Sequence, residues 1–190
     1  MADPAYIVNG TLTDGEAWVA VAQTTLGTDA TGVTFTSTDD GQVGDWSQYM
    51  DLVLVCYDQS NTEIYSILRF NNDAGTNYTY KMFGGDGSSI NTYGGINSSY
   101  VHQGYCSKVS DGANVFSVQV THMFDINSGK FKNTMSQSAN DEDGSGYAEI
   151  NTTIWESQAP ITEIDILGWT ADWKAGSMFS LFGILPRMVA

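Results

Sequence analysis

Alternating apolar and polar residues predict strands along most of the chain. Residues 115–126 show the longest alternation: apart from His122, every second side chain from Phe116 to Phe124 is apolar. A period of two places the apolar and polar sets on opposite faces of a strand. Residues 146–157 alternate similarly, whereas residues 51–57 form an apolar run typical of a central strand buried on both faces. Further strands are expected at 33–37, 64–70, 78–83, 161–169 and 178–185.

Clusters of Gly, Asn, Asp and Ser separate these runs, and no window of ten or more residues carries a helical stripe. Strands that recur roughly every ten residues, with a few longer crossovers, are typical of an antiparallel β-sandwich of jelly-roll or Greek-key type. The expected fold class is therefore all-β. A chain of 190 residues fits one domain spanning 1–190, with short arms at about 1–15 and 186–190.

Residues 84–114 are the least patterned part of the chain and are rich in Gly, Ser, Asn and Tyr. We interpret them as a long crossover loop of the sandwich. The alternative is a binding loop, because ordered loops of this length are often functional and because Tyr, Ser, Gly and Asn dominate adaptable binding loops.

The charge of the chain is strongly negative, at −15, with only seven basic residues and no basic cluster. Nucleic acid and anionic membranes are therefore not expected partners, since both need clustered cations. The acidity favours solubility, with docking to a basic surface or binding of divalent cations as the alternative.

The chain starts without the basic and apolar segments of a signal peptide, and no apolar run is long enough to span a membrane. Synthesis in a cytoplasm is expected.

Signals for catalysis are sparse, and we expect no enzyme. The two histidines are His102, in the loop-like region, and His122, on the apolar face of the best strand, where a core or interface histidine is expected. No nucleophile elbow, phosphate loop or dinucleotide fingerprint is present. Carboxylates on strands are interpreted as outward-facing and solubilising, with a glycosidase pair as a weaker alternative. These carboxylates are Glu149, Glu156, Glu163 and Asp165.

One acidic segment resembles the start of a calcium loop. Asp141, Asp143 and Ser145 place oxygen atoms at alternate positions, and Gly146 occupies the sixth. The twelfth position is Thr152, which cannot supply the bidentate carboxylate, and a strand rather than a helix follows. We expect an acidic hairpin turn here and no cofactor, with calcium as the weaker alternative.

Aromatic residues form the candidate surface for a ligand or partner, because their rings stack on sugars and fill interfaces. Trp169 and Trp173 flank a short loop and are the tryptophans expected to be exposed, while most others belong in the core. The candidate residues are Tyr93, Tyr100, Tyr105, Trp169 and Trp173.

The two cysteines do not form a framework of disulfides. Cys56 lies in an apolar run where a buried, reduced thiol is expected, and Cys106 follows Gly104 and Tyr105 in the loop-like region. A bridge between them is not indicated.

Several segments resemble a family of uncharacterised structural proteins of tailed phages. Residues 161–166, a short loop and residues 174–184 are similar to the C-terminal signature of that family, roughly I-x-x-I-x-I, a loop, then G-S-x-F-S-L-Y-G-I, with Phe182 in place of the usual Tyr. Residues 49–54 and 68–78 are similar to its Y-x-x-L-x-L and L-R-F-N-x-D-x-G-x-N-Y segments. The resemblance implies a virion protein with a β-sandwich fold.

The expected function is therefore structural: a capsid decoration (cement) or head-spike subunit, made in the host bacterium and located in the virion. Its expected partners are the major capsid protein or tail proteins and copies of itself, with a trimer as the first choice. The alternative function is a tail-fibre or receptor-binding module that holds host glycan with residues 84–114 and exposed tryptophans.

Overall fold

The computed structural model describes residues 7–8, 11–12, 18–62, 64–142 and 144–185, and the expected terminal arms lie almost wholly outside this range. The described chain is all-β, as predicted, with two short 3-10 helices, η1 (Trp46–Gln48) and η2 (Val109–Asp111). None of its helices is long and apolar enough to cross a membrane. The strands are β1 (Ile7–Val8), β2 (Thr11–Leu12), β3 (Trp18–Thr25), β4 (Gly32–Thr36), β5 (Asp51–Ser60), β6 (Ile64–Phe70), β7 (Tyr78–Gly85), β8 (Ile90–Ser98), β9 (Val101–Lys108), β10 (Ser117–Phe124), β11 (Lys132–Asp141), β12 (Gly146–Trp155), β13 (Glu163–Gly168) and β14 (Met178–Ile184).

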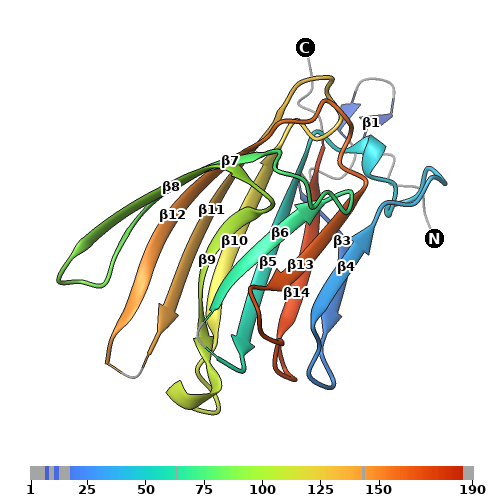
Figure 1. The fold of residues 1–190 in the computed structure, drawn as a ribbon. Helices are drawn as coiled ribbons and strands as arrows, with labels where there is room; N and C mark the ends of the chain where they lie inside the picture. The colour runs from blue at the N-terminus through green and yellow to red at the C-terminus, as the bar shows by residue number, and fades with distance from the viewer. Residues whose placement is uncertain (1–6, 9–10, 13–17, 63, 143, 186–190) are drawn as a thin grey trace.

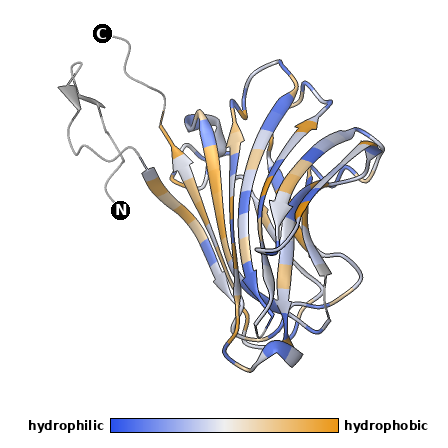
Figure 2. Ribbon diagram, turned by 90° about the vertical axis from the view of Figure 1, so that its left-hand side faces the viewer, coloured by the Kyte–Doolittle hydropathy of each residue, from blue (hydrophilic) through white to orange (hydrophobic). Residues whose placement is uncertain are grey.

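The long strands form two layers (Figure 1). The larger layer has the order β3-β14-β5-β10-β11-β12-β7-β8, and the smaller one has the order β4-β13-β6-β9. Neighbours within each layer are antiparallel, and a two-residue parallel pairing of Gln59 and Ser60 with Ser107 and Lys108 joins the layers. Figure 2 shows the layers from the side, with hydrophilic and hydrophobic bands along the strands.

The strand order is that of a jelly roll, which confirms the predicted fold. The pairs β3/β4, β5/β6, β9/β10 and β13/β14 each place one strand in each layer, and the two C-terminal strands are inserted between earlier ones. Two hairpins, β7–β8 and β11–β12, are additions to this eight-stranded plan. Both join the larger layer on the same side, beyond β10 (Figure 1). We call these four strands the extension.

The apolar core lies between the layers of the eight-stranded part. Leu52 and Leu54 of β5 point into it, together with Phe70 of β6, Ile166 of β13 and Phe179 of β14. Val53 of the same strand faces the other way and is also buried, so the central strand predicted at 51–57 is largely covered on both faces. Replacing one such Leu by Ala costs about 2–5 kcal/mol because a cavity remains.

The interior becomes polar toward the extension. Ser66 donates to Gln103 Oε1 (2.6 Å), Gln103 Nε2 donates to Thr121 Oγ1 (2.7 Å), and the hydroxyls of Thr121 and Ser136 lie 2.8 Å apart. Strand β9 packs across β10, β11 and β12 and supplies Gln103, which links Ser66 of β6 to Thr121 of β10. Buried polar groups are stable when they are paired in this way.

The strand with the longest predicted alternation, at 115–126, therefore does not follow the usual arrangement, in which the apolar side of a strand faces the interior. The polar residues Ser117, Gln119 and Thr121 face inward and are buried, whereas Val118 and Val120 face outward and are about 40% exposed. The inward partners come from β9 and β11, so the polar side is the better fit for this interior.

The prediction of a long loop at 84–114 is wrong, because this region contains the strands β8 and β9. Strand β9 is almost completely buried, and Cys106 lies on it as a free, buried thiol, as does Cys56 on β5. Gly104 allows β9 to press against β11: its φ is 149°, and a Cβ there would lie 2.0 Å from Ser138 Oγ. Gly104, which looks like part of a loop in the sequence, is thus a site of close packing.

Candidate functional site

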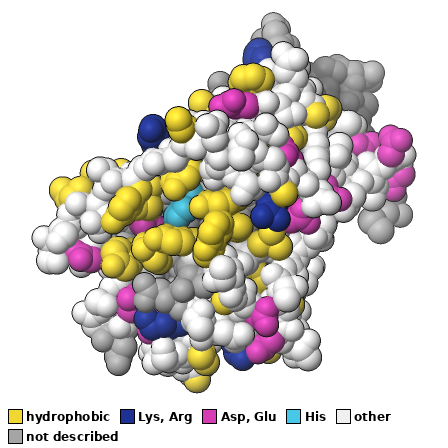
Figure 3. All heavy atoms as spheres, viewed as in Figure 1, with side chains coloured by type: hydrophobic (Ala, Val, Ile, Leu, Met, Phe, Trp, Pro, Cys, Tyr) yellow, Lys and Arg dark blue, Asp and Glu magenta, His cyan; other side chains and the backbone are white. Residues whose placement is uncertain are grey.

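Seven ring side chains form a continuous line where the edge of the smaller layer meets the extension. Neighbouring ring centroids are 4.2 to 6.3 Å apart. Figure 3 views this face and shows hydrophobic side chains gathered around a histidine. We call the line the aromatic row. In order, its members are Trp169, Tyr100, Tyr80, His102, Tyr65, Tyr105 and Tyr147.

The pairing of strands from different parts of the chain assembles this row. Strands β6 and β9 place Tyr65 opposite Tyr105, and the two hydroxyls are hydrogen-bonded. Tyr80 comes from β7, where its partner on β8 is Gly95. A Cβ at Gly95 would lie 2.5 Å from the Tyr80 ring, so this glycine makes room for the ring. Trp169 directly follows β13 and contacts Tyr100 edge-on at 4.8 Å.

Burial keeps the centre of the row neutral. His102 lies between two rings, stacked on Tyr80 and tilted against Tyr65, and burial lowers its pKa to about 4. The pKa of Tyr105 is raised by burial and by its bond to Tyr65. His102 is therefore an uncharged ring at neutral pH, on β9 rather than in a loop.

Glu149, beneath this region, is buried and does not face outward as predicted. Its Oε2 accepts a hydrogen bond from the Tyr105 backbone N–H (3.0 Å) and one from Ser138 (3.3 Å). Burial nevertheless raises its pKa. The carboxylate thus fastens β9 to β11 and β12.

Three of the five candidate aromatic residues belong to the row: Tyr100, Tyr105 and Trp169. Tyr93 is exposed on β8, opposite Met82, beside the row. The expected exposure of Trp173 is wrong, because this side chain lies in the core, where it packs against Phe179 and its Nε1 donates to the Ile166 carbonyl.

The acidic segment suggested as a calcium loop forms the tight turn of the β11–β12 hairpin. Asp141 pairs with Gly146, and the Glu142 N–H donates to the Ser145 carbonyl (3.0 Å). Asp143 lies outside the described residues. No group of three metal-binding side chains occurs among the residues that are described. The geometry fits the hairpin-turn interpretation.

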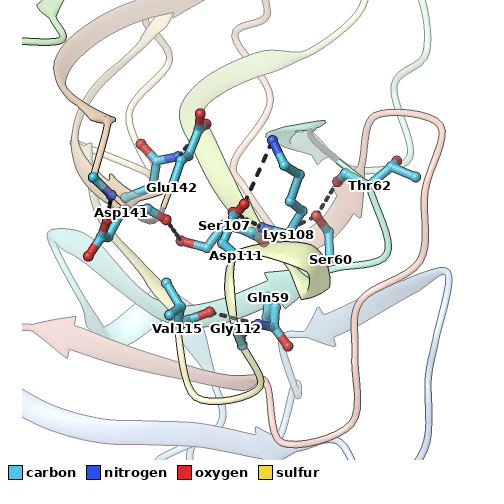
Figure 4. Close-up of polar contacts among 12 residues, drawn as sticks. Gln59, Ser60, Thr62, Ser107, Lys108, Asp111, Gly112, Val115, Asp141 and Glu142 are labelled. Atoms are coloured by element: carbon cyan, nitrogen blue, oxygen red, sulfur yellow. Dashed lines mark hydrogen bonds and ion pairs between the residues drawn. The ribbon is translucent and has the colours of Figure 1, made fainter.

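The same hairpin is fastened to the point where the two layers join (Figure 4). Ser107 Oγ donates to the Asp141 carbonyl (3.1 Å), and Ser60 Oγ donates to the Ser107 carbonyl (3.3 Å). Beside them, Gln59 Nε2 donates to the Gly112 and Val115 carbonyls, both at 2.8 Å. These hydrogen bonds hold together the end of the sandwich where β5 pairs with β9, and we assign them a structural role.

The buried Asp58 is the most perturbed carboxyl group of the described chain. Ser117 and Gln119 donate to its Oδ1, while burial raises its pKa to about 7. The thiols of Cys56 and Cys106 also have raised pKa values because they are buried. The side chains of Asp58, Cys56 and Cys106 are all inaccessible to solvent, so we assign this cluster a structural role and not a catalytic one.

A second surface lies on the side of the larger layer that points away from the smaller one. We call it the outer face. Its eight prominent apolar side chains lie on adjacent strands and are each 37–55% exposed. They are Tyr57, Phe83, Val118, Val120, Phe124, Met135, Ile150 and Ile154.

His122 lies among these apolar residues. Its Nε2 is 2.9 Å from Asp51 Oδ2, and its ring stacks on Phe124 at 3.9 Å. It was expected to be a core or interface histidine, and it is half-buried on the outer face.

No protein-family model matches the chain, and no curated protein matches it at a significant level.

Proposed function

We propose that this chain is a non-enzymatic structural subunit of a tailed-phage particle, a capsid decoration or head-spike protein. It assembles into a homo-oligomer, with a trimer expected, through the outer face. The outer face is the observation that supports this proposal. The jelly-roll plan, which viral capsid and lectin domains share, is compatible with it but does not decide it.

The apolar area of the outer face is large for an exposed surface. Eight side chains that each expose 37–55% of their surface present on the order of 700 Å² of largely apolar area. The largest apolar patch of a typical monomer is about 300–600 Å², and a standard interface buries about 800 Å² on each partner. The area is thus sufficient for a stable contact between subunits.

The charge distribution favours a second copy as the occupant of this face. The chain carries 22 acidic residues, yet the charged residues that β5, β10, β11, β12 and β7 direct outward are Asp51, Lys81 and Asp141. Asp51 is paired with His122. Two highly acidic subunits can therefore meet here with little repulsion, whereas most of their remaining surface repels.

The roles of the buried ionisable groups support a non-enzymatic function. Asp58 and Glu149 are buried and accept hydrogen bonds from neighbouring strands, and His102 is buried between Tyr65 and Tyr80. A general acid or base must reach the reacting proton, which enclosed groups of this kind do not do.

The test is the oligomeric state of the purified protein. Wild type is expected to elute as an oligomer in size-exclusion chromatography with light scattering, whereas Val120→Lys is expected to be monomeric with unchanged circular dichroism. Val109→Lys, at an apolar residue of η2 that is at least as exposed as Val120, is the control and should stay oligomeric. A monomeric wild type, or an oligomer that survives Val120→Lys, would refute assembly through the outer face.

The place in the particle is tested by counting copies in purified virions by quantitative gel densitometry. A copy number comparable to that of the major capsid protein is expected for a decoration protein. A few dozen copies or fewer would instead favour the tail.

A further inference from the structure

We propose that the aromatic row is a binding site for an uncharged carbohydrate chain. The observation is a line of seven rings where the edge of the smaller layer meets the extension, with its end member Trp169 42% exposed. This proposal stands independently of how the protein assembles, because the row and the outer face lie on different surfaces of the sandwich.

The row is separate from the apolar core. The core has its own tryptophans, Trp46, Trp155 and Trp173, which are buried. Every member of the row carries a polar group on its ring, as a hydroxyl or a ring N–H, and rings of this kind are typical of sites that are apolar on one side and wet on the other. The row therefore has the character of a recognition surface.

The shape of the row suits an extended ligand. Tyr100, Tyr80 and His102 are stacked in sequence with interplanar angles of 20–29°, and Tyr105 and Tyr147 are stacked at 22°. Trp169 extends the line at one end. A chain of sugar rings can follow such a line, because the C–H faces of sugars pack on aromatic rings while their hydroxyls remain at the sides.

The polar residues beside the row fit the hydroxyls of a sugar. By strand register, Asn91, Tyr93 and Ser98 of β8 share the face of Tyr80. Amides and hydroxyls both donate and accept hydrogen bonds, as sugar hydroxyls do. A proline-rich peptide, the other common ligand of aromatic grooves, offers few donors because proline has no N–H.

Charge favours a neutral ligand over an anionic one at the same site. The net charge of the chain is −15, and His102 is neutral because burial lowers its pKa. The nearby cation Arg69 donates its Nε–H to the Ser99 carbonyl. A neutral ligand avoids the repulsion that phosphate or acidic glycans would meet.

Glycan-array binding of the full chain tests the proposal, followed by titration of the best neutral glycan with tryptophan fluorescence. We expect wild type to bind neutral glycans, and Trp169→Ala and Tyr100→Ala to weaken binding by about tenfold or more, as expected for loss of one stacked ring. Trp169→Phe should restore most of the affinity. Phe131→Ala removes an exposed ring outside the row and should bind as wild type does.

Near-ultraviolet circular dichroism and thermal melting confirm that each variant is folded. The proposal is overturned if wild type retains no neutral glycan, if it prefers acidic glycans or a proline-rich peptide, or if folded Trp169→Ala and Tyr100→Ala variants bind as tightly as wild type. The oligomeric state, measured in parallel, reports separately on the outer face.

Discussion

Asp58 should make the protein less stable as the pH rises. Its pKa is about 7 in the folded protein, against an ordinary value of 3.8. Between these values the folded chain holds a proton that the unfolded chain releases, so the free energy of unfolding falls with rising pH across this window and levels off above it. A shift of about three units corresponds to about 4 kcal/mol, which is an upper bound.

Asp58→Asn isolates this effect, because the amide is neutral at every pH and has nearly the same shape. At pH 4.5 the variant should be more stable by only about 1 kcal/mol, since both folded proteins place a neutral group beside Ser117 and Gln119 and only the unfolded Asp58 is ionised. By pH 8 the variant should be more stable than wild type by up to about 4 kcal/mol, or roughly 8–16 °C in melting temperature for a chain of this size.

The assay is urea unfolding followed by tryptophan fluorescence and circular dichroism, at several pH values between 4.5 and 8.5 and at constant protein concentration and ionic strength. Asp39→Asn, at an exposed acid, is the control for a general change of charge. A difference between wild type and Asp58→Asn that does not change with pH would refute the reasoning, because it would mean that Asp58 ionises alike in both states.

Three further substitutions test the packing around the same interior. The stability of His102→Phe should be less sensitive to acid than that of wild type. In wild type the folded histidine has a pKa of about 4, so between pH 6.5 and 4 only the unfolded chain binds a proton, and this favours unfolding. Thermal melting at a series of pH values should show that the variant gains up to about 3 kcal/mol over wild type by pH 4. Thr121→Val should lower the free energy of unfolding by about 1–3 kcal/mol, because it leaves two buried hydrogen-bond partners unsatisfied. Val120→Thr should change the free energy of unfolding of the monomer by less than about 0.5 kcal/mol. Both are measured by urea unfolding at a dilution where the chain is monomeric, and a larger loss for Val120→Thr than for Thr121→Val would contradict the orientation of β10. Gly104→Ala should destabilise the protein by about 2–4 kcal/mol, because its Cβ would collide with Ser138 at a residue whose φ is positive. Gly27→Ala, with open space around it, should be nearly neutral in the same thermal melts. Equal effects of the two substitutions would contradict the close approach of β9 to β11.

The periodicity of the sequence predicts the strands well but does not reveal which side of a strand faces inward. At 117–124 the alternation is present as predicted, yet the polar side is the buried one. The choice depends on Gln103 and Ser136, which lie on other strands and supply hydrogen bonds to Thr121. Partners of this kind are invisible in a local pattern.

The strands β8 and β9 escape sequence reasoning for a related reason. Their Gly-, Asn- and Tyr-rich composition is typical of loops, and they are stabilised by pairing with β7 and β6. Gly95 and Gly104 are needed because the neighbouring Tyr80 ring and Ser138 occupy the space of a side chain.

The candidate site was found in part. Tyr100, Tyr105 and Trp169 stand out because they lie in a conspicuously Tyr- and Gly-rich region or beside a short loop. Tyr65, Tyr80, His102 and Tyr147 lie on four different strands, and only the folded topology brings them together. The strands predicted at 64–70, 78–83 and 146–157 contain Tyr65, Tyr80 and Tyr147, but these patterns indicate strands and not a site.

The position of β14 has a consequence for the order in which the protein is synthesised. This C-terminal strand pairs with β3 on one side and β5 on the other, so the two early strands do not complete the layer without it. A ribosome makes residues 18–60 long before residues 178–184 emerge. During that interval β3 and β5 have unpaired edges, which are prone to intermolecular pairing. Nascent chains that terminate ahead of Met178 should therefore aggregate, and native structure should appear only after residues 178–184 have emerged from the ribosome.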